Sequence, residues 1–241
     1  TWKRTNLSNS ADLSSFFLAD GHAYPGDAHN MTFALAGDKV LVGWISKYCD
    51  GGSPAYTWVD EEENDLYPDI WGVAGAQKSV DYTLQGFPEV GEIPYSCVWS
   101  ARGTLLEVDA EGVPTDGGGF YDIIWTKAER LTSGRRDANR LEMNGDGAAG
   151  FMMTWQEDPE GLRPGQGLGP GEGWSGAVVN AQTDLWYSYI SIDDFVQVQT
   201  SDDDETPISI YEYTSDTMPK VAAPMALPVR LTDNGMCKET N

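Results

Sequence analysis

The chain has 241 residues, and its 15 lysines and arginines stand against 38 aspartates and glutamates, which gives a formal net charge of −23. So acidic a chain argues against binding nucleic acid or an anionic membrane, because both are bound through cationic patches. The hydrophobic fraction of 40% argues against intrinsic disorder. No apolar run approaches the roughly 20 residues of a membrane-spanning helix.

The N-terminal segment, residues 1–36, holds both histidines of the chain, His22 and His29, in a polar stretch that ends near Met31. Imidazole and thioether ligands suit copper. A Pro-Gly turn between the histidines can bring the two rings together. We therefore consider a copper site at His22, His29 and Met31, with a polar N-terminal loop as the alternative.

Short runs rich in valine, isoleucine, tyrosine, tryptophan and threonine follow along the rest of the chain, each bounded by glycine, proline, asparagine or aspartate. This pattern is typical of β-strands, and no window shows sustained helical periodicity with caps at both ends. The sequence predicts an all-β protein. The expected strands lie in residues 31–37, 38–48, 79–87, 95–108, 120–132, 150–156, 176–192, 195–200 and 207–214.

Three cysteines have no spacing typical of a zinc ribbon or of covalent haem. Cys49 follows one predicted strand and Cys97 lies within another, and we predict a disulfide between them, with a pair of buried thiols as the alternative. Cys237 is then left over, which in a secreted chain suggests a partner elsewhere.

A faint internal repeat covers most of the chain. Residues 37–52 resemble 147–161, since each has a turn, an apolar strand ending in tryptophan, and an acidic turn. Residues 121–134 resemble 183–190 followed by 228–235. We therefore predict one domain, 37–241, with two blade-like units at about 37–134 and 147–235.

These units resemble blades of a sialidase-like β-propeller carrying long Gly/Pro-rich inserted loops. A propeller needs about four to eight blades to close. Two units therefore predict only part of a ring.

Three blocks, residues 69–106, 125–143 and 154–190, are similar to the core of the choice-of-anchor O proteins, which are large bacterial surface proteins. The resemblance covers roughly residues 37–237. It implies an exported protein, located outside the cell or on its surface, with a propeller-like body. The chain stops where the family continues, so the resemblance implies that another protein chain, or further blades of the same precursor, completes the fold.

The segment 156–176 combines many glycines and prolines with the carboxylates of Glu157, Asp158, Glu160 and Glu172. Carboxylate and carbonyl oxygens are the ligands that Ca²⁺ prefers, and a cation would offset the repulsion between the carboxylates. We consider a calcium site here. The alternatives are an ordered loop held by turns, aromatic contacts and an Arg163 ion pair, or a plain spacer.

A basic cluster, Arg130, Arg135, Arg136 and Arg140, stands out in this acidic chain. Converging arginines bind carboxylates, as sialidase-type sites do with acidic sugars. The neighbouring acids Glu129, Asp137 and Glu142 are ready partners, so the sequence favours structural ion pairs over a ligand site.

No catalytic motif is present, and no residue is singled out as catalytic. We therefore expect a non-catalytic cell-surface β-propeller protein, or a subunit of a larger surface assembly, stabilised by calcium. The alternatives are a secreted sialidase-like glycan hydrolase and a copper-binding surface protein.

Overall fold

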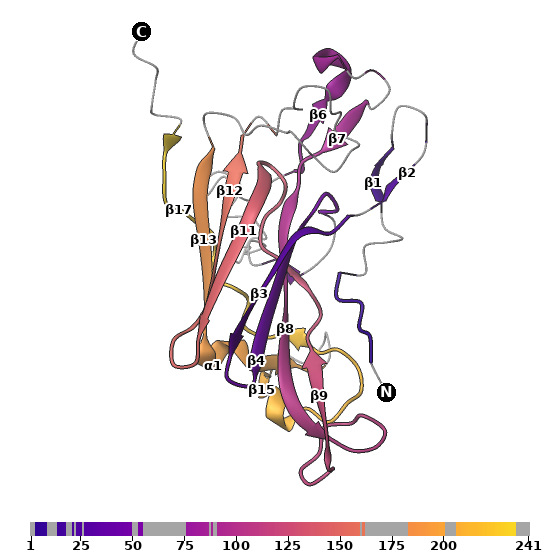
Figure 1. Ribbon diagram of the computed structural model, residues 1–241, viewed down its shortest axis with the longest axis vertical. Coiled ribbons are helices and arrows are strands. Elements are labelled where there is room, and N and C mark those ends of the chain that lie inside the picture. The colour runs from indigo at the N-terminus through magenta and orange to yellow at the C-terminus, as the bar shows by residue number, and fades with distance from the viewer. Residues whose placement is uncertain are drawn as a thin grey trace.

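The computed structural model describes residues 3–8, 14–17, 21, 23–25, 27–49, 53–54, 76–86, 88, 91–159, 161, 183–200 and 206–234. As predicted, the protein is all-β, with antiparallel sheets of which none closes on itself (Figure 1). The strands are β1 (Ser14–Phe17), β2 (Ala23–Pro25), β3 (His29–Ala36), β4 (Lys39–Ser46), β5 (Ser53–Pro54), β6 (Ser79–Asp81), β7 (Glu92–Pro94), β8 (Cys97–Val108), β9 (Phe120–Trp125), β10 (Glu129–Arg130), β11 (Asp137–Asp146), β12 (Gly150–Asp158), β13 (Asp184–Ser191), β14 (Gln197–Gln199), β15 (Ile208–Ser209), β16 (Lys220–Val221) and β17 (Val229–Arg230). The helices are the 3₁₀ turns η1 (Tyr82–Gln85) and η2 (Ile210–Glu212) and the single-turn α1 (Ile192–Phe195).

Two sheets form the body of the molecule. The first sheet has the order β3-β4-β8-β10-β5, with β9 also paired to β8. The second sheet has the order β11-β12-β13-β17. Each sheet begins with a hairpin whose turn lies near residue 37 or residue 147. The first strand of each sheet therefore lies before the corresponding start of the two repeat units in the sequence.

The strand registers relate the two sheets as repeats of one meander. Trp44 of β4 lies opposite Trp99 of β8, and Trp155 of β12 lies opposite Trp186 of β13. Strand β4 therefore corresponds to β12, and β8 corresponds to β13.

The first strands of the two sheets share an unusual backbone feature. Asn30 of β3 and Arg140 of β11 have φ angles of 47° and 53°. Each lies at a β-bulge where the register with the next strand shifts. Left-handed φ is uncommon outside glycine, and bulges of this kind bend a strand. The same bend at the same place makes β3 and β11 counterparts.

The fourth strands, β10 and β17, correspond as well, through the Arg-Leu-Thr segments 130–132 and 230–232. The leucine N–H of 130–132 donates to the Val98 carbonyl over 2.8 Å, and the threonine hydroxyl accepts from the Val98 N–H over 3.0 Å. The leucine and threonine of 230–232 make the same two bonds with Leu185, over 2.7 and 2.9 Å. This register makes β13 the counterpart of β8, whereas the sequence comparison aligned residues 183–190 with 121–134.

The two sheets pack face to face around one apolar core. Two alanines of β3 and the larger Leu41 and Ile45 of β4 on the first sheet join side chains of β11, β12 and β13 on the second. Gly43 of β4 allows this close approach, because a Cβ there would lie 2.7 Å from Met153 Cε and 2.9 Å from Leu141 Cδ2. The core comprises Ala34, Ala36, Leu41, Ile45, Val98, Leu131, Ala138, Leu141, Phe151, Met153, Trp155, Trp186, Ile190, Phe195 and Met225.

A buried ion pair fastens the later part of the chain to the first sheet. Arg102 of β8 donates through Nη2 to Glu129 Oε1 over 2.7 Å, and both side chains are buried. Arg102 also donates to the carbonyls of Asp194 and Ala223, while Glu129 Oε2 accepts from the Met225 N–H. These bonds anchor α1 and the segment before β17 below the body. The small sheet β15-β14-β16 lies beside them.

Candidate functional site

A disulfide joins Cys49 and Cys97, as the sequence predicted, with 5.7 Å between the Cα atoms. It ties the chain after β4 to the first residue of β8, next to Trp99, whose Nε1 donates to the Tyr48 carbonyl over 3.0 Å. Cys237 lies outside the described residues.

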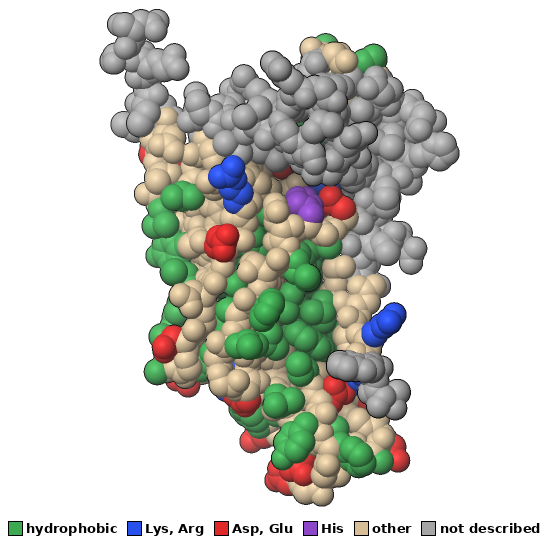
Figure 2. Space-filling view, in the orientation of Figure 1, with side chains coloured by type: hydrophobic (Ala, Val, Ile, Leu, Met, Phe, Trp, Pro, Cys, Tyr) green, Lys and Arg blue, Asp and Glu red, His purple; other side chains and the backbone are tan. Residues whose placement is uncertain are grey.

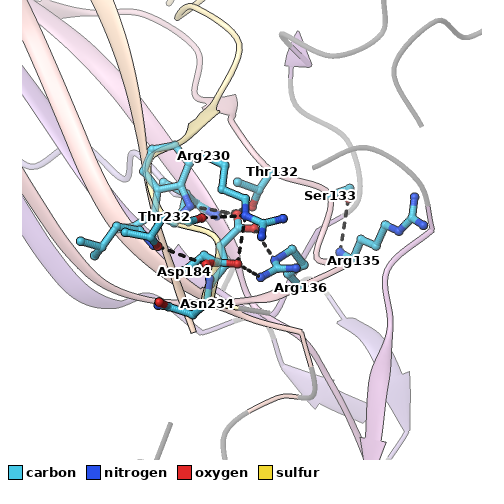
Figure 3. A network of polar contacts seen from close by, with 12 residues as sticks. Thr132, Ser133, Arg135, Arg136, Asp184, Arg230, Thr232 and Asn234 are labelled. Carbon is cyan, nitrogen blue, oxygen red and sulfur yellow. Dashed lines mark hydrogen bonds and ion pairs between the residues drawn. The ribbon is translucent and has the colours of Figure 1, made fainter. Parts of the chain in front are cut away.

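A buried charge network occupies the corresponding end of the second sheet (Figure 3). Its centre is Asp184, the first residue of β13 and the counterpart of Cys97. The Asp184 carboxylate lies 2.8 Å from Arg136 Nη2 and 3.1 Å from Arg230 Nε. It also accepts from the Asn234 N–H and the Thr232 hydroxyl, over 2.8 and 3.1 Å. Two guanidinium groups and two hydrogen bonds therefore compensate this buried carboxylate.

Glu157 of β12 extends the network into the core. Its Oε1 accepts from Trp155 Nε1 over 2.9 Å, and its Oε2 lies 3.4 Å from Arg136 Nε. Burial raises the pKa of Glu157 to about 7, against the opposing effects of the Trp155 hydrogen bond and the Arg136 charge. This carboxyl group therefore titrates near neutral pH.

The calcium prediction concerned four carboxylates, of which Glu160 and Glu172 lie outside the described residues. Glu157 and Asp158 are consecutive in β12, so their side chains leave the strand on opposite sides. Within the described part of the chain, no group of three or more histidine, cysteine or acidic side chains is arranged to hold a metal ion. The calcium site stays a prediction.

The four arginines of the basic cluster do not converge on one site. Arg136 lies in the buried network, while the Arg135 side chain points away from it (Figure 3). Arg140 is exposed at the bulge of β11, and Arg130 belongs to β10. Two open grooves, of about 460 and 540 Å³, contain no arginine among their lining residues.

The proposed copper ligands are only partly described, because His22 lies outside the described residues. His29 Nδ1 lies 3.1 Å from Asp27 Oδ2. Burial alone would raise the pKa of Asp27, but His29 and the N–H and charge of Lys47 together lower it. The Met31 side chain is 73% exposed on β3.

Among the described residues, the outer side of the first sheet carries an unusual surface. Met31, Phe33 and Leu35 alternate along β3 and are 73%, 63% and 63% exposed. In register with them on β4 lie Val40, which is buried, and Val42, which is half-buried. We call the surface formed by these five residues the open face, and Figure 2 shows it as an apolar area over β3 and β4. Monomeric proteins rarely expose a contiguous apolar surface of this kind without an interaction.

The repeat shows what the open face corresponds to. By register, Phe33 is the counterpart of Met143, and Val42 is the counterpart of Met153. Met153 is fully buried, and Met143 packs against the same core. The second sheet buries its inner face against the first sheet. The open face of the first sheet is the counterpart of that inner face.

The sequence held a signal for this correspondence that sequence reasoning missed. Asp27-Ala28 and Asp137-Ala138 precede the bulges of β3 and β11, in the stretches 27–30 (DAHN) and 137–140 (DANR). Aligning the repeat from the two tryptophans backwards through the hairpins would have paired them. It would also have placed Phe33 at a core position.

Comparison with protein-family models, with curated proteins and with solved structures finds no match. None of the helices in the described ranges is long and apolar enough to cross a membrane.

Proposed function

We propose that the protein is a non-catalytic subunit of an exported, cell-surface assembly and that it binds its partner through the open face. The observation that carries this proposal is the exposure of Phe33 at a position whose counterpart, Met143, packs in the core. Leaving such a surface in water costs free energy that a partner recovers by covering it.

The proposed location outside the cell is supported by the Cys49–Cys97 disulfide, since disulfides persist in oxidising compartments. The high negative charge supports it as well, because it keeps a protein with an apolar patch soluble. The resemblance to the choice-of-anchor O proteins points to the same setting.

The finer fold proposal is two neighbouring units of a sialidase-like β-propeller. Its support is that counterpart faces of the two sheets point in the same sense, as in a ring of blades. A closed ring would need both outer flanks to be apolar. The outer side of the second sheet carries Glu142, Asn144 and Asp146 along β11, so we propose part of a ring with one flank to be covered.

Position-specific photo-crosslinking in the producing cells tests the proposed function. A benzophenone amino acid at Phe33 is expected to form an adduct with another polypeptide, whereas the same probe at Leu84 of η1, 85% exposed, is expected to form none. Equal absence of adducts at both positions in intact cells would contradict the proposal.

A further inference from the structure

The open face has the composition of an interface core rather than of a solvated sheet. Its residues on β3 and β4 are paired in register, Phe33 with Val42, and Val42 is paired in turn with the buried Ala101 of β8. On this side of β3, β4 and β8, no side chain in register with the stretch from Met31 to Leu35 is charged. A solvated face of an antiparallel sheet is polar instead.

The outer side of the second sheet differs in this respect. Exposed Met152, Leu185 and Tyr189 are present on β12 and β13, but exposed Glu142 and Asp146 border them on β11. A head-to-tail contact that repeated the packing of the two sheets would place β3 of one copy against β11 of another. It would bury these carboxylates against Phe33 without a cation, which is costly.

We propose that the open face binds the open face of a second copy of this chain, in a two-fold symmetric contact. This inference rests on the proposed function and names the partner of the same surface. A single self-complementary apolar face is what an isologous contact requires, and two-fold dimers are the commonest symmetric assemblies. The second copy takes the place of the neighbouring sheet that the repeat lacks.

The exposed side chains of the open face supply part of the area that a dimer interface needs. At their exposures, Met31, Phe33 and Leu35 together present on the order of 400 Å² of side-chain surface. A standard interface removes about 800 Å² per partner, so these three residues supply the centre and polar residues around them supply the rim.

The charge of the chain adds a condition to this contact. Two copies that each carry a net charge of −23 repel one another at low salt, and the uncharged open face is where they can approach. Association is therefore expected to strengthen with ionic strength, because salt screens the repulsion while the apolar contact remains.

Sedimentation velocity of the purified chain between about 1 and 100 μM, at low and high salt, tests the proposal. We expect a species of twice the 26.3 kDa chain mass that forms more readily at high salt. Phe33→Glu is expected to weaken dimer formation at least tenfold, and Leu84→Glu is the matched control that leaves it unchanged. Circular dichroism checks that both variants are folded, which their exposure favours.

A wild-type chain that stays monomeric at every concentration and salt level would overturn the proposal, as would a Phe33→Glu variant that dimerises like the wild type. A monomer that still crosslinks to a different polypeptide through position 33 in cells would leave the proposed function standing. Absence of both the dimer and the adduct would remove the proposed function as well.

Discussion

The open face of the first sheet and the inner face of the second sheet are equivalent surfaces of the repeat. The inner face of the second sheet is buried within the chain, whereas the open face is largely exposed. On the second sheet, Met143 and Met153 pack against β3 and β4. On the first sheet, their counterpart Phe33 is 63% exposed, and Val42 is half-buried against the cluster around Trp44 and Trp99. The difference shows that the apolar character of the position comes from the repeat and that burial depends on a neighbour. A partner can therefore replace a sheet.

The largest loss of stability is expected at the start of the third strand of each sheet, where the two sheets use different interactions. Cys97 starts β8 with a disulfide, and its counterpart Asp184 starts β13 with two arginines. Asp184→Ala removes the buried carboxylate that Arg136 and Arg230 share, while Arg136 keeps Glu157 and Arg230 keeps Asp233. Because a buried charge loses its main partner, we expect a loss of about 3–5 kcal/mol in the free energy of unfolding. Urea unfolding followed by tryptophan fluorescence measures it. A loss below about 1 kcal/mol would show that the network is dispensable.

The next effect contrasts the counterparts Met153 and Val42. Met153→Ala opens a cavity in the core, and we expect it to cost about 2–5 kcal/mol. Val42→Ala at the half-buried counterpart is expected to cost less than about 1 kcal/mol in the monomer. Equal costs in urea unfolding of the dilute chain would contradict the contrast between a covered and an uncovered face.

Reduction of the disulfide tests how much this bond stabilises the first sheet. The Cys49–Cys97 bridge closes a sequence separation of 48 residues, so dithiothreitol is expected to lower the free energy of unfolding by about 2–4 kcal/mol. A Cys49→Ala variant is the control, because its stability should not respond to the reductant. A wild type that is equally insensitive would show that the bridge adds no stability.

The pH dependence of stability tests the buried charge network of the second sheet. Because the folded-state pKa of Glu157 is raised from 4.5 to about 7, its contribution to stability is full below pH 4.5 and is lost as the pH rises through 7. Glu157→Gln removes this titration, so we expect its stability relative to the wild type to rise by about 2–3 kcal/mol between pH 4.5 and 8.

Ser46→Ala changes the counterpart residue on β4, which does not titrate, and it serves as the control for this pH series. Parallel pH curves for wild type and Glu157→Gln would contradict the assignment.

The all-β fold and the disulfide could be predicted from the sequence because strand composition and cysteine placement are local signals. The two sheets could be anticipated only roughly, since the repeat begins at bulged stretches, 27–36 and 137–146, whose sequences share little beyond their opening Asp-Ala. The buried network could not be predicted. It depends on strand pairing that brings Arg136 and Arg230 to Asp184, whereas the sequence offered either a ligand site or ion pairs of Arg136 with acids close to it along the chain.

Sequence reasoning also placed Met31 in a possible copper site, because two imidazoles and a thioether make a ligand set that suits copper. The structure gives Met31 another setting, since β3 carries it on the same side as Phe33 and Leu35. The shared side of these three residues becomes visible only when β3 is known to be a strand whose opposite side is buried.

The most direct test of the central claim, that the open face is covered by a partner copy, is hydroxyl-radical footprinting of Met31 at increasing protein concentration. Met218, half-buried and remote from the open face in sequence and sheet, serves as the reference. We predict that the oxidation rate of Met31, relative to that of Met218, falls several-fold as the dimer forms and recovers in Phe33→Glu. A relative rate that stays constant from about 1 to 100 μM would contradict the account.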